Sequence, residues 1–111
     1  MIIAETILYR KQRGAAQRIR IVINRPEQDP APDGDVRCRV AITGEKPRYL
    51  YGVDSFQALN MAFVYLRTVA EGWMKRRQDW YFDRQLKYPY DIDVLILNDL
   101  SRFEKTGQAK R

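Results

Sequence analysis

One stretch, residues 51–59, constrains the fold of this chain most strongly, because it carries an extended segment into a long helix. Asp54 is suited to cap that helix, since its carboxylate can accept an otherwise unpaired backbone N–H. Gln57, three residues later, can reciprocate in a capping box. Gly52 immediately precedes this turn and indicates a close approach that a Cβ would forbid. The sequence therefore predicts a helix that begins at residue 54.

The helix that follows is amphipathic. Its apolar residues recur at spacings of three and four, which places them on one side of a helix. The stripe consists of Leu59, Ala62, Phe63, Leu66, Val69, Ala70 and Trp73. Positive charge at 75–77 suits the expected end of the helix, where it complements the helix dipole. We expect one helix over 54–76, with Phe63 buried against a neighbouring layer.

The chain before the helix has the composition of β-strands, rich in β-branched and aromatic residues. Strands are expected at 1–9, 18–23, 35–43 and 48–53. A polar link at 11–14 predicts a hairpin between the first two strands. The segment 26–34 holds three prolines and three acids, which predicts an exposed loop. Successive strands followed by a helix favour an antiparallel meander with the helix across one face.

Alternation within two of these strands assigns their side chains to the two faces of the sheet. The inward row is Ile19, Ile21, Ile23, Val36, Cys38, Val40 and Ile42. The outward row holds Arg18, Arg20, Arg37 and Arg39, and Arg48 on the next strand is a fifth candidate. Because Cys38 lies among inward apolar residues, we interpret it as a core residue and not as a nucleophile.

The residues after the helix predict smaller elements. Residues 79–83 hold three aromatics between acids, which favours a short fifth strand. Residues 91–103 carry an apolar stripe that favours a helix, and a buried strand at 94–97 remains the alternative. Residues 1–105 are expected to form a single domain, and 106–111 are expected to fray. The expected fold is a two-layer α+β sandwich, with an antiparallel sheet of four or five strands, one long helix on one face and a short C-terminal helix.

The composition limits the classes of function. The chain of 111 residues has no histidine, which removes the commonest general base and the imidazole ligands of metal sites. No glycine-rich phosphate loop follows a strand. Acids at Asp91, Asp93 and Asp99 could hold a magnesium ion, but they are more typical of solvated groups near a helix end. We expect no catalytic residues, no metal and no cofactor, and a protein that is not an enzyme.

The sequence also bears on localisation. It contains no run of 18 apolar residues and no signal-peptide pattern. Its single cysteine, Cys38, cannot form an intramolecular disulfide, which agrees with a reducing compartment. We expect a cytoplasmic protein without membrane contact.

One motif carries a family resemblance. The string Tyr51-Gly-Val-Asp-Ser-x-Gln-Ala-Leu59, preceded by a cysteine-bearing strand and followed by an apolar helix, resembles a family of small bacterial proteins of unknown function. The resemblance covers residues 5–83, and Trp80 matches the tryptophan of a short strand that follows the helix in that family. It implies an antiparallel sheet before the helix and supplies no catalytic residue. Residues 89–111 depart from the family pattern as an addition.

The net charge of +6 permits a nucleic acid, an anionic surface or an acidic protein as the partner. Clustered arginines and tyrosines favour a protein, since both residue types supply binding hot spots. We therefore expect a small non-catalytic protein-binding module with an acidic partner, such as an inhibitor or immunity-type protein in bacterial conflict systems. The alternative is nucleic-acid binding without sequence preference, in which the arginine row contacts phosphates. A homo-oligomer is also left open.

Overall fold

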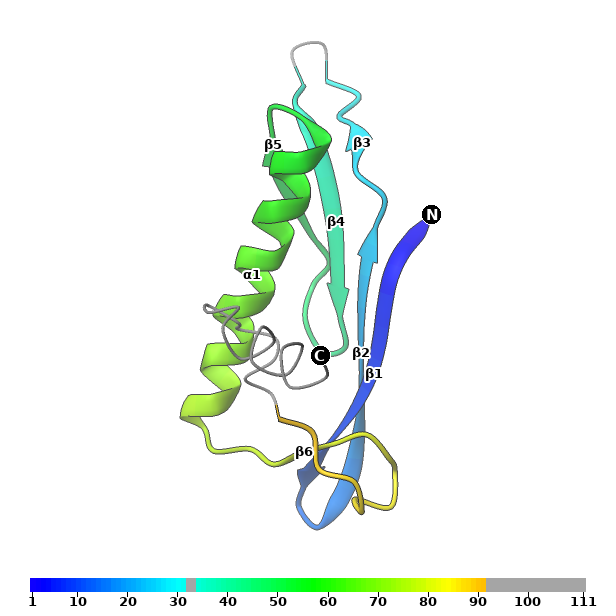
Figure 1. Ribbon diagram of the computed structural model, residues 1–111, viewed down its shortest axis with the longest axis vertical. Coiled ribbons are helices and arrows are strands. Elements are labelled where there is room, and N and C mark those ends of the chain that lie inside the picture. The colour runs from blue at the N-terminus through cyan, green and yellow to red at the C-terminus, as the bar shows by residue number, and fades with distance from the viewer. Residues whose placement is uncertain (32–33, 92–111) are drawn as a thin grey trace, which may run out of the picture.

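The computed structural model describes residues 1–31 and 34–91. The elements are β1 (Ile2–Gln12), β2 (Ala15–Asn24), β3 (Glu27–Gln28), β4 (Val36–Ile42), β5 (Arg48–Gly52), α1 (Ser55–Lys75) and β6 (Trp80–Tyr81). The strands form one antiparallel sheet in which β4 pairs with β5 on one side and with β2 and β3 on the other. β1 follows β2, and β6 pairs with β1. Figure 1 shows α1 running alongside β4 and β5, which confirms the expected α+β architecture.

The predicted hairpin is formed by β1 and β2. Its two-residue turn, Arg13 and Gly14, has φ angles of 52° and 79°. Positive φ at both positions is typical of the hairpin turn whose twist matches that of the flanking strands. The register runs without interruption from Gln12 opposite Ala15 to Ala4 opposite Ile23, and it shifts by one residue before Ile2. The hairpin is therefore regular except for an irregularity at Ile3.

The loop expected over 26–34 contains a strand that the sequence did not predict. Glu27 and Gln28 form β3 and pair with Arg37 and Val36 of β4. Pro26 separates β3 from β2, because proline has no N–H to donate to a ladder. With β3 and β6 included, the described sheet has six strands, more than the four or five that we expected.

The start of α1 follows the predicted capping pattern with one difference. Asp54 Oδ1 accepts a hydrogen bond from the Gln57 backbone N–H at 2.8 Å. Gln57 Oε1 accepts from the backbone N–H of Val53, at 2.7 Å, one residue before the expected partner. A Cβ on Gly52 would lie 2.8 Å from the Gln57 carbonyl carbon and would also collide with the backbone nitrogen of Ala58. The end of β5 and the first turn of α1 thus touch through backbone atoms, which explains the glycine.

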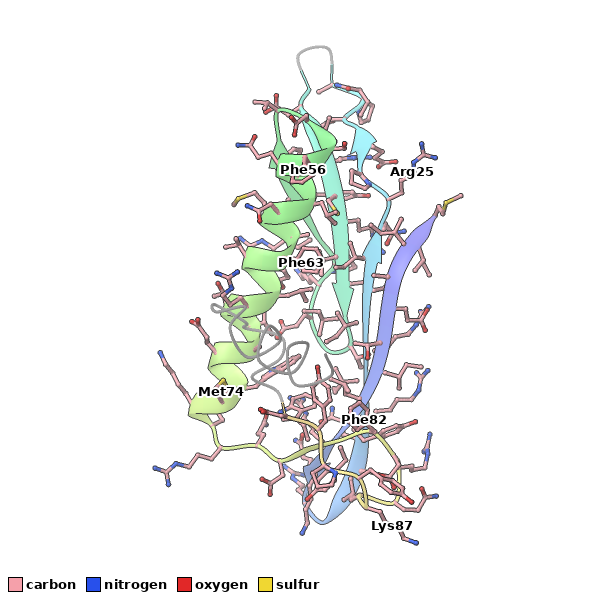
Figure 2. The ribbon with its side chains drawn as sticks, in the orientation of Figure 1. Arg25, Phe56, Phe63, Met74, Phe82 and Lys87 are labelled. Carbon is pink, nitrogen blue, oxygen red and sulfur yellow. The ribbon has the colours of Figure 1, made fainter. Side chains whose placement is uncertain are left out.

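The buried face of α1 differs from the predicted stripe. Its buried residues are Ala58, Ala62, Leu66, Ala70 and Trp73. Phe63 is 48% exposed, so the prediction that it packs against the sheet was wrong. The separation of packed elements depends on the size of the side chains at the contact, and alanines permit a close approach. The helix is therefore rotated so that small residues face β4 and β5, which leaves Phe63 on its flank, where Figure 2 labels it.

The inward row of the sheet is confirmed. Leu8 of β1, the isoleucines of β2 and Cys38, Val40 and Ile42 of β4 are buried in one cluster with the inner face of α1. The expected fifth strand is present as β6, which pairs with Tyr9 and Arg10. Trp80 of β6 lies against Trp73 of α1, with 4.5 Å between ring centroids. The two tryptophans thus join the end of the helix to the end of the sheet.

Two further expectations concern the ends of the chain and the membrane. The helix predicted over 91–103, its strand alternative at 94–97 and the tail 106–111 fall outside the described residues, apart from Asp91. Across 1–31 and 34–91, no helix is both long enough and apolar enough to cross a membrane.

Candidate binding surface

The side of the sheet away from α1 carries the outward-pointing arginines of β2 and β4. Residues directly opposite one another in antiparallel strands share a face. Arg39 lies opposite Tyr49, and Arg37 lies opposite Tyr51, whereas the alternate residues of β4 are buried toward the helix. We call this side the open face. Its members include Glu5, Ile7, Tyr9, Arg18, Arg20, Val22, Glu27, Arg37, Arg39, Ala41, Tyr49, Tyr51 and Tyr81.

Four of the five predicted arginines, Arg18, Arg20, Arg37 and Arg39, lie on the open face. Arg48 does not, because it lies opposite the buried Val40. Its guanidinium carbon is 5.0 Å from the ring centroid of Tyr65, a residue of α1. β5 alternates so that its two tyrosines face outward and Arg48 faces the helix, which corrects the assignment of Arg48 to the basic surface.

Two of the four arginines are paired with carboxylates. Arg20 donates to both oxygens of Glu5, with its Nη2 3.0 Å from Oε2 and its Nε 3.1 Å from Oε1. This hydrogen bonding lowers the pKa of the Glu5 carboxyl. Arg37 Nη2 lies 2.9 Å from Glu27 Oε1. Within 1–31 and 34–91, Arg18 and Arg39 have no such ion pair, so they are the cations available to a partner.

Arg37 is held from both sides of its strand. β3 supplies Glu27, and β5 supplies Tyr49, whose ring centroid lies 4.2 Å from the Arg37 guanidinium carbon. An arginine stacked on an aromatic ring and paired with a carboxylate has lost much of its rotamer freedom. Binding of a partner to Arg37 therefore costs little further side-chain conformational entropy. The role of Glu27 could not be predicted from the sequence, because no pattern in a proline-rich segment indicates a pairing with β4.

A second arginine and tyrosine pair lies at the other end of the open face. Tyr9 of β1 is opposite Tyr81 of β6. The guanidinium carbon of Arg84, in the segment after β6, lies 5.5 Å from the Tyr9 ring centroid. Both ends of the open face thus combine arginine with exposed or half-buried tyrosine.

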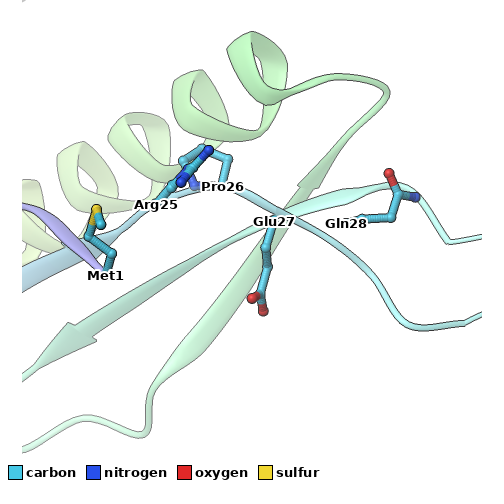
Figure 3. Close-up of a pocket in the computed structure, with 5 residues that line it drawn as sticks. All are labelled: Met1, Arg25, Pro26, Glu27 and Gln28. Carbon is cyan, nitrogen blue, oxygen red and sulfur yellow. The ribbon is translucent and has the colours of Figure 1, made fainter.

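A hollow lies where β2 passes into β3, as Figure 3 shows. It is lined by Met1, Arg25, Pro26, Glu27 and Gln28. None of these five residues is a nucleophile, and the carboxylate of Glu27 is held by Arg37. The hollow therefore offers no arrangement for acid–base or nucleophilic chemistry. Of the three acids considered for a metal site, Asp93 and Asp99 fall outside the described residues.

Cys38 is buried, and its Sγ donates to the backbone oxygen of Asn24 at 3.3 Å. Burial raises the pKa of the Cys38 thiol, and the thiol form is a poor nucleophile. We expect a thiol reagent such as iodoacetamide to leave the native protein unlabelled at pH 7.5 and to label one cysteine after denaturation. Mass spectrometry measures both states. Rapid labelling of the native protein would contradict the core assignment.

The geometry defines a small α+β protein with one helix-covered sheet face and one arginine- and tyrosine-bearing face. No family model, curated protein or solved structure matches the chain. The resemblance of residues 51–59 to a small bacterial family therefore stays a prediction.

Proposed function

We propose that this protein is a small non-catalytic binding module that recognises an acidic protein through the open face of its sheet. The observation that carries the proposal is Arg37, fixed between Glu27 and Tyr49 and flanked by Arg39 and Tyr51. Arginine and tyrosine are enriched among the residues that dominate binding energy at protein interfaces. An inhibitor or immunity role, as suggested by the sequence, would use such a surface to block a larger partner.

The expected charge of the partner follows from the ion pairs. Arg18 and Arg39 add positive charge to the open face, and neither forms an ion pair with the described residues. Complementary charge on a partner steers association and excludes basic competitors. An acidic surface on the partner therefore fits this face best.

The same geometry supports a protein more than a nucleic acid. Phosphate-dominated binding grows with the number of cations that release counterions, and Glu5 and Glu27 already pair with two of the four arginines. Single-stranded nucleic acids also need free aromatic faces on which bases stack. One face of Tyr49 is covered by Arg37, which leaves less aromatic surface for that purpose.

The test uses charge reversal on the two sides of the sheet. Arg39→Glu should weaken binding of the partner by about tenfold or more, because it places like charges together at the interface. Arg48→Glu is the matched control, since it makes the same charge change on the side that α1 covers. Partners captured from a bacterial lysate with wild type and both variants would be identified by mass spectrometry. Their affinities would then be measured with purified proteins, and circular dichroism would check the fold of each variant.

Each outcome has a distinct meaning. A partner lost with Arg39→Glu and retained with Arg48→Glu supports the proposal. A partner that binds all three proteins equally shows that the open face is not the contact. If capture depends on nucleic acid, and if the affinity for oligonucleotides falls linearly with salt on logarithmic axes, the nucleic-acid alternative is correct. A turnover activity in the purified protein would overturn the non-catalytic assignment.

A further inference from the structure

On the side of β1 away from β2, no strand of the described residues (1–31 and 34–91) pairs with the first part of β1. β1 pairs with β2 from end to end, but β6 pairs only with Tyr9 and Arg10. Figure 1 shows this part of β1 at the outer margin of the sheet, with β2 on one side and no described strand on the other. We call residues 2–8 the β1 edge. It shares Glu5 and Ile7 with the open face, but it offers a partner backbone groups and not arginine side chains.

The hydrogen bonds of β2 identify which backbone groups of β1 point outward. The N–H of Arg20 donates to Thr43 Oγ1, and the carbonyl oxygen of Arg20 accepts from the Thr43 N–H, so both groups face β4. In an antiparallel ladder, the opposite residue, Ile7, then turns its N–H and C=O away from β2. Glu5 has the same phase. The backbone groups of Lys11 also point away from β2, and its N–H donates to the backbone oxygen of Asp79, beyond the β1 edge.

Within the part of the chain that the structure describes, the β1 edge lacks the usual protection of an edge strand. Proteins block such edges with lysine, proline, a covering segment or a short strand. Residues 2–8 contain no lysine and no proline, and their one charged residue, Glu5, is paired with Arg20. Met1, Ile2 and Ile3 are exposed beside the edge, Met1 by 84%. At the opposite margin of the sheet, β5 has only five residues and begins with an arginine.

We infer that a second copy of this chain occupies the β1 edge, with the two β1 strands antiparallel about a two-fold axis at Thr6. Two copies related by a two-fold axis contact each other through the same surface, so that surface must be complementary to itself. In this register Glu5 of one copy lies opposite Ile7 of its partner, so the outward backbone groups meet and the two carboxylates do not face each other. The edge carries no unpaired charge, so it suits a neutral strand, such as β1 itself, better than an acidic or basic peptide.

The same arrangement covers exposed apolar residues at both ends of β1. Antiparallel pairing directs the N-terminus of one copy toward the β6 end of the other. Phe82 and Tyr88 are exposed at that end, and Figure 2 shows Phe82 beside the lower part of β1. A stable interface buries at least about 1,000 Å² in total, which a short strand pairing alone does not reach. Contacts of Met1, Ile2 and Ile3 with this aromatic segment would add the missing area.

Disulfide trapping tests the register directly. Thr6→Cys places one thiol from each copy at the two-fold axis, in a non-hydrogen-bonded pair, where opposing side chains lie closest. Thr68→Cys, on the exposed side of α1, is the matched control. The native Cys38 is buried and does not compete. Under mild oxidation we expect most of the Thr6→Cys protein, and little of the control, to become a covalent dimer on a non-reducing gel.

Proline substitution tests the backbone pairing. Ile7→Pro removes an N–H that points to the edge and leaves the β1–β2 ladder donors in place. Sedimentation of the wild type should show a reversible dimer, and Ile7→Pro should raise its dissociation constant at least tenfold while the far-UV circular dichroism stays unchanged.

A wild-type protein that remains monomeric over the accessible concentration range would overturn the inference, and in that case Thr6→Cys would not crosslink faster than the control. A dimer that tolerates Ile7→Pro without Thr6→Cys crosslinking would place the contact elsewhere and would also overturn it. If Ile7→Pro fails to fold, the crosslinking comparison decides by itself.

Discussion

Replacing Trp80 by alanine is expected to lower the free energy of unfolding by about 3 to 5 kcal/mol, the range for deleting a buried tryptophan. The Trp80 side chain is only 3% exposed, and its ring centroid lies 4.5 Å from that of Trp73. β6 has only two residues, so its attachment depends on this side chain more than on its ladder. Urea unfolding followed by circular dichroism gives the change.

Two further substitutions test whether the loss of stability in Trp80→Ala comes from lost packing. Tyr88→Ala removes an aromatic ring of the same segment that is 66% exposed, and it should change stability by no more than about 0.5 kcal/mol. Trp80→Phe should cost much less than Trp80→Ala, because the indole Nε1 is buried without a hydrogen-bond partner among the described residues and its loss leaves no acceptor unpaired. Similar losses for Trp80→Ala and Tyr88→Ala would contradict the assignment of Trp80 to the core.

The second large effect is expected at Leu66, where substitution by alanine should cost about 2 to 5 kcal/mol. Leu66 is the largest aliphatic side chain on the buried face of α1. Phe63→Ala, three residues earlier on the same helix, should cost less than about 1 kcal/mol, because the ring is half exposed. Thermal and chemical denaturation of the two variants provide the comparison. A larger loss for Phe63→Ala would mean that α1 packs in the orientation that the apolar stripe first suggested.

The two faces of β2 and β4 could be predicted, because side chains that alternate with a period of two have little freedom, whereas the two-residue β3 could not. Once Ile19 and Val40 are inward, every second neighbour is inward as well, and a shift by one residue would expose the whole row. The burial of Cys38 and the outward position of Arg37 and Arg39 follow from that alternation alone. The entry to α1 was equally predictable, because the cap at Asp54 is local in sequence.

The errors arose where partners distant in sequence decide the outcome. A helix can rotate by a fraction of a turn and still present an apolar side, and α1 packs against β4 and β5 with its alanines inward instead of Phe63. Arg48 lies in a short strand whose phase is set by its pairing with β4. On the open face, the outward arginines could be predicted, but their pairings with Glu5 and Glu27 could not. The sequence of one strand does not determine which residue of a neighbouring strand lies opposite it.

The two-residue turn at Arg13 and Gly14 has a consequence for how the chain folds. It closes ten opposing residue pairs of β1 and β2 through contacts that are mostly near in sequence. Such hairpins form in roughly 1 to 10 μs, whereas contacts between distant segments first require the closure of larger loops. We expect β4, β5 and α1 to join after the hairpin, and β6, which follows α1 in the chain, to pair with β1 last. We therefore expect the hairpin to form early, and we expect β6, which follows the end of α1 at Lys75 by only a few residues, to dock at a small cost in loop-closure entropy once α1 is in place.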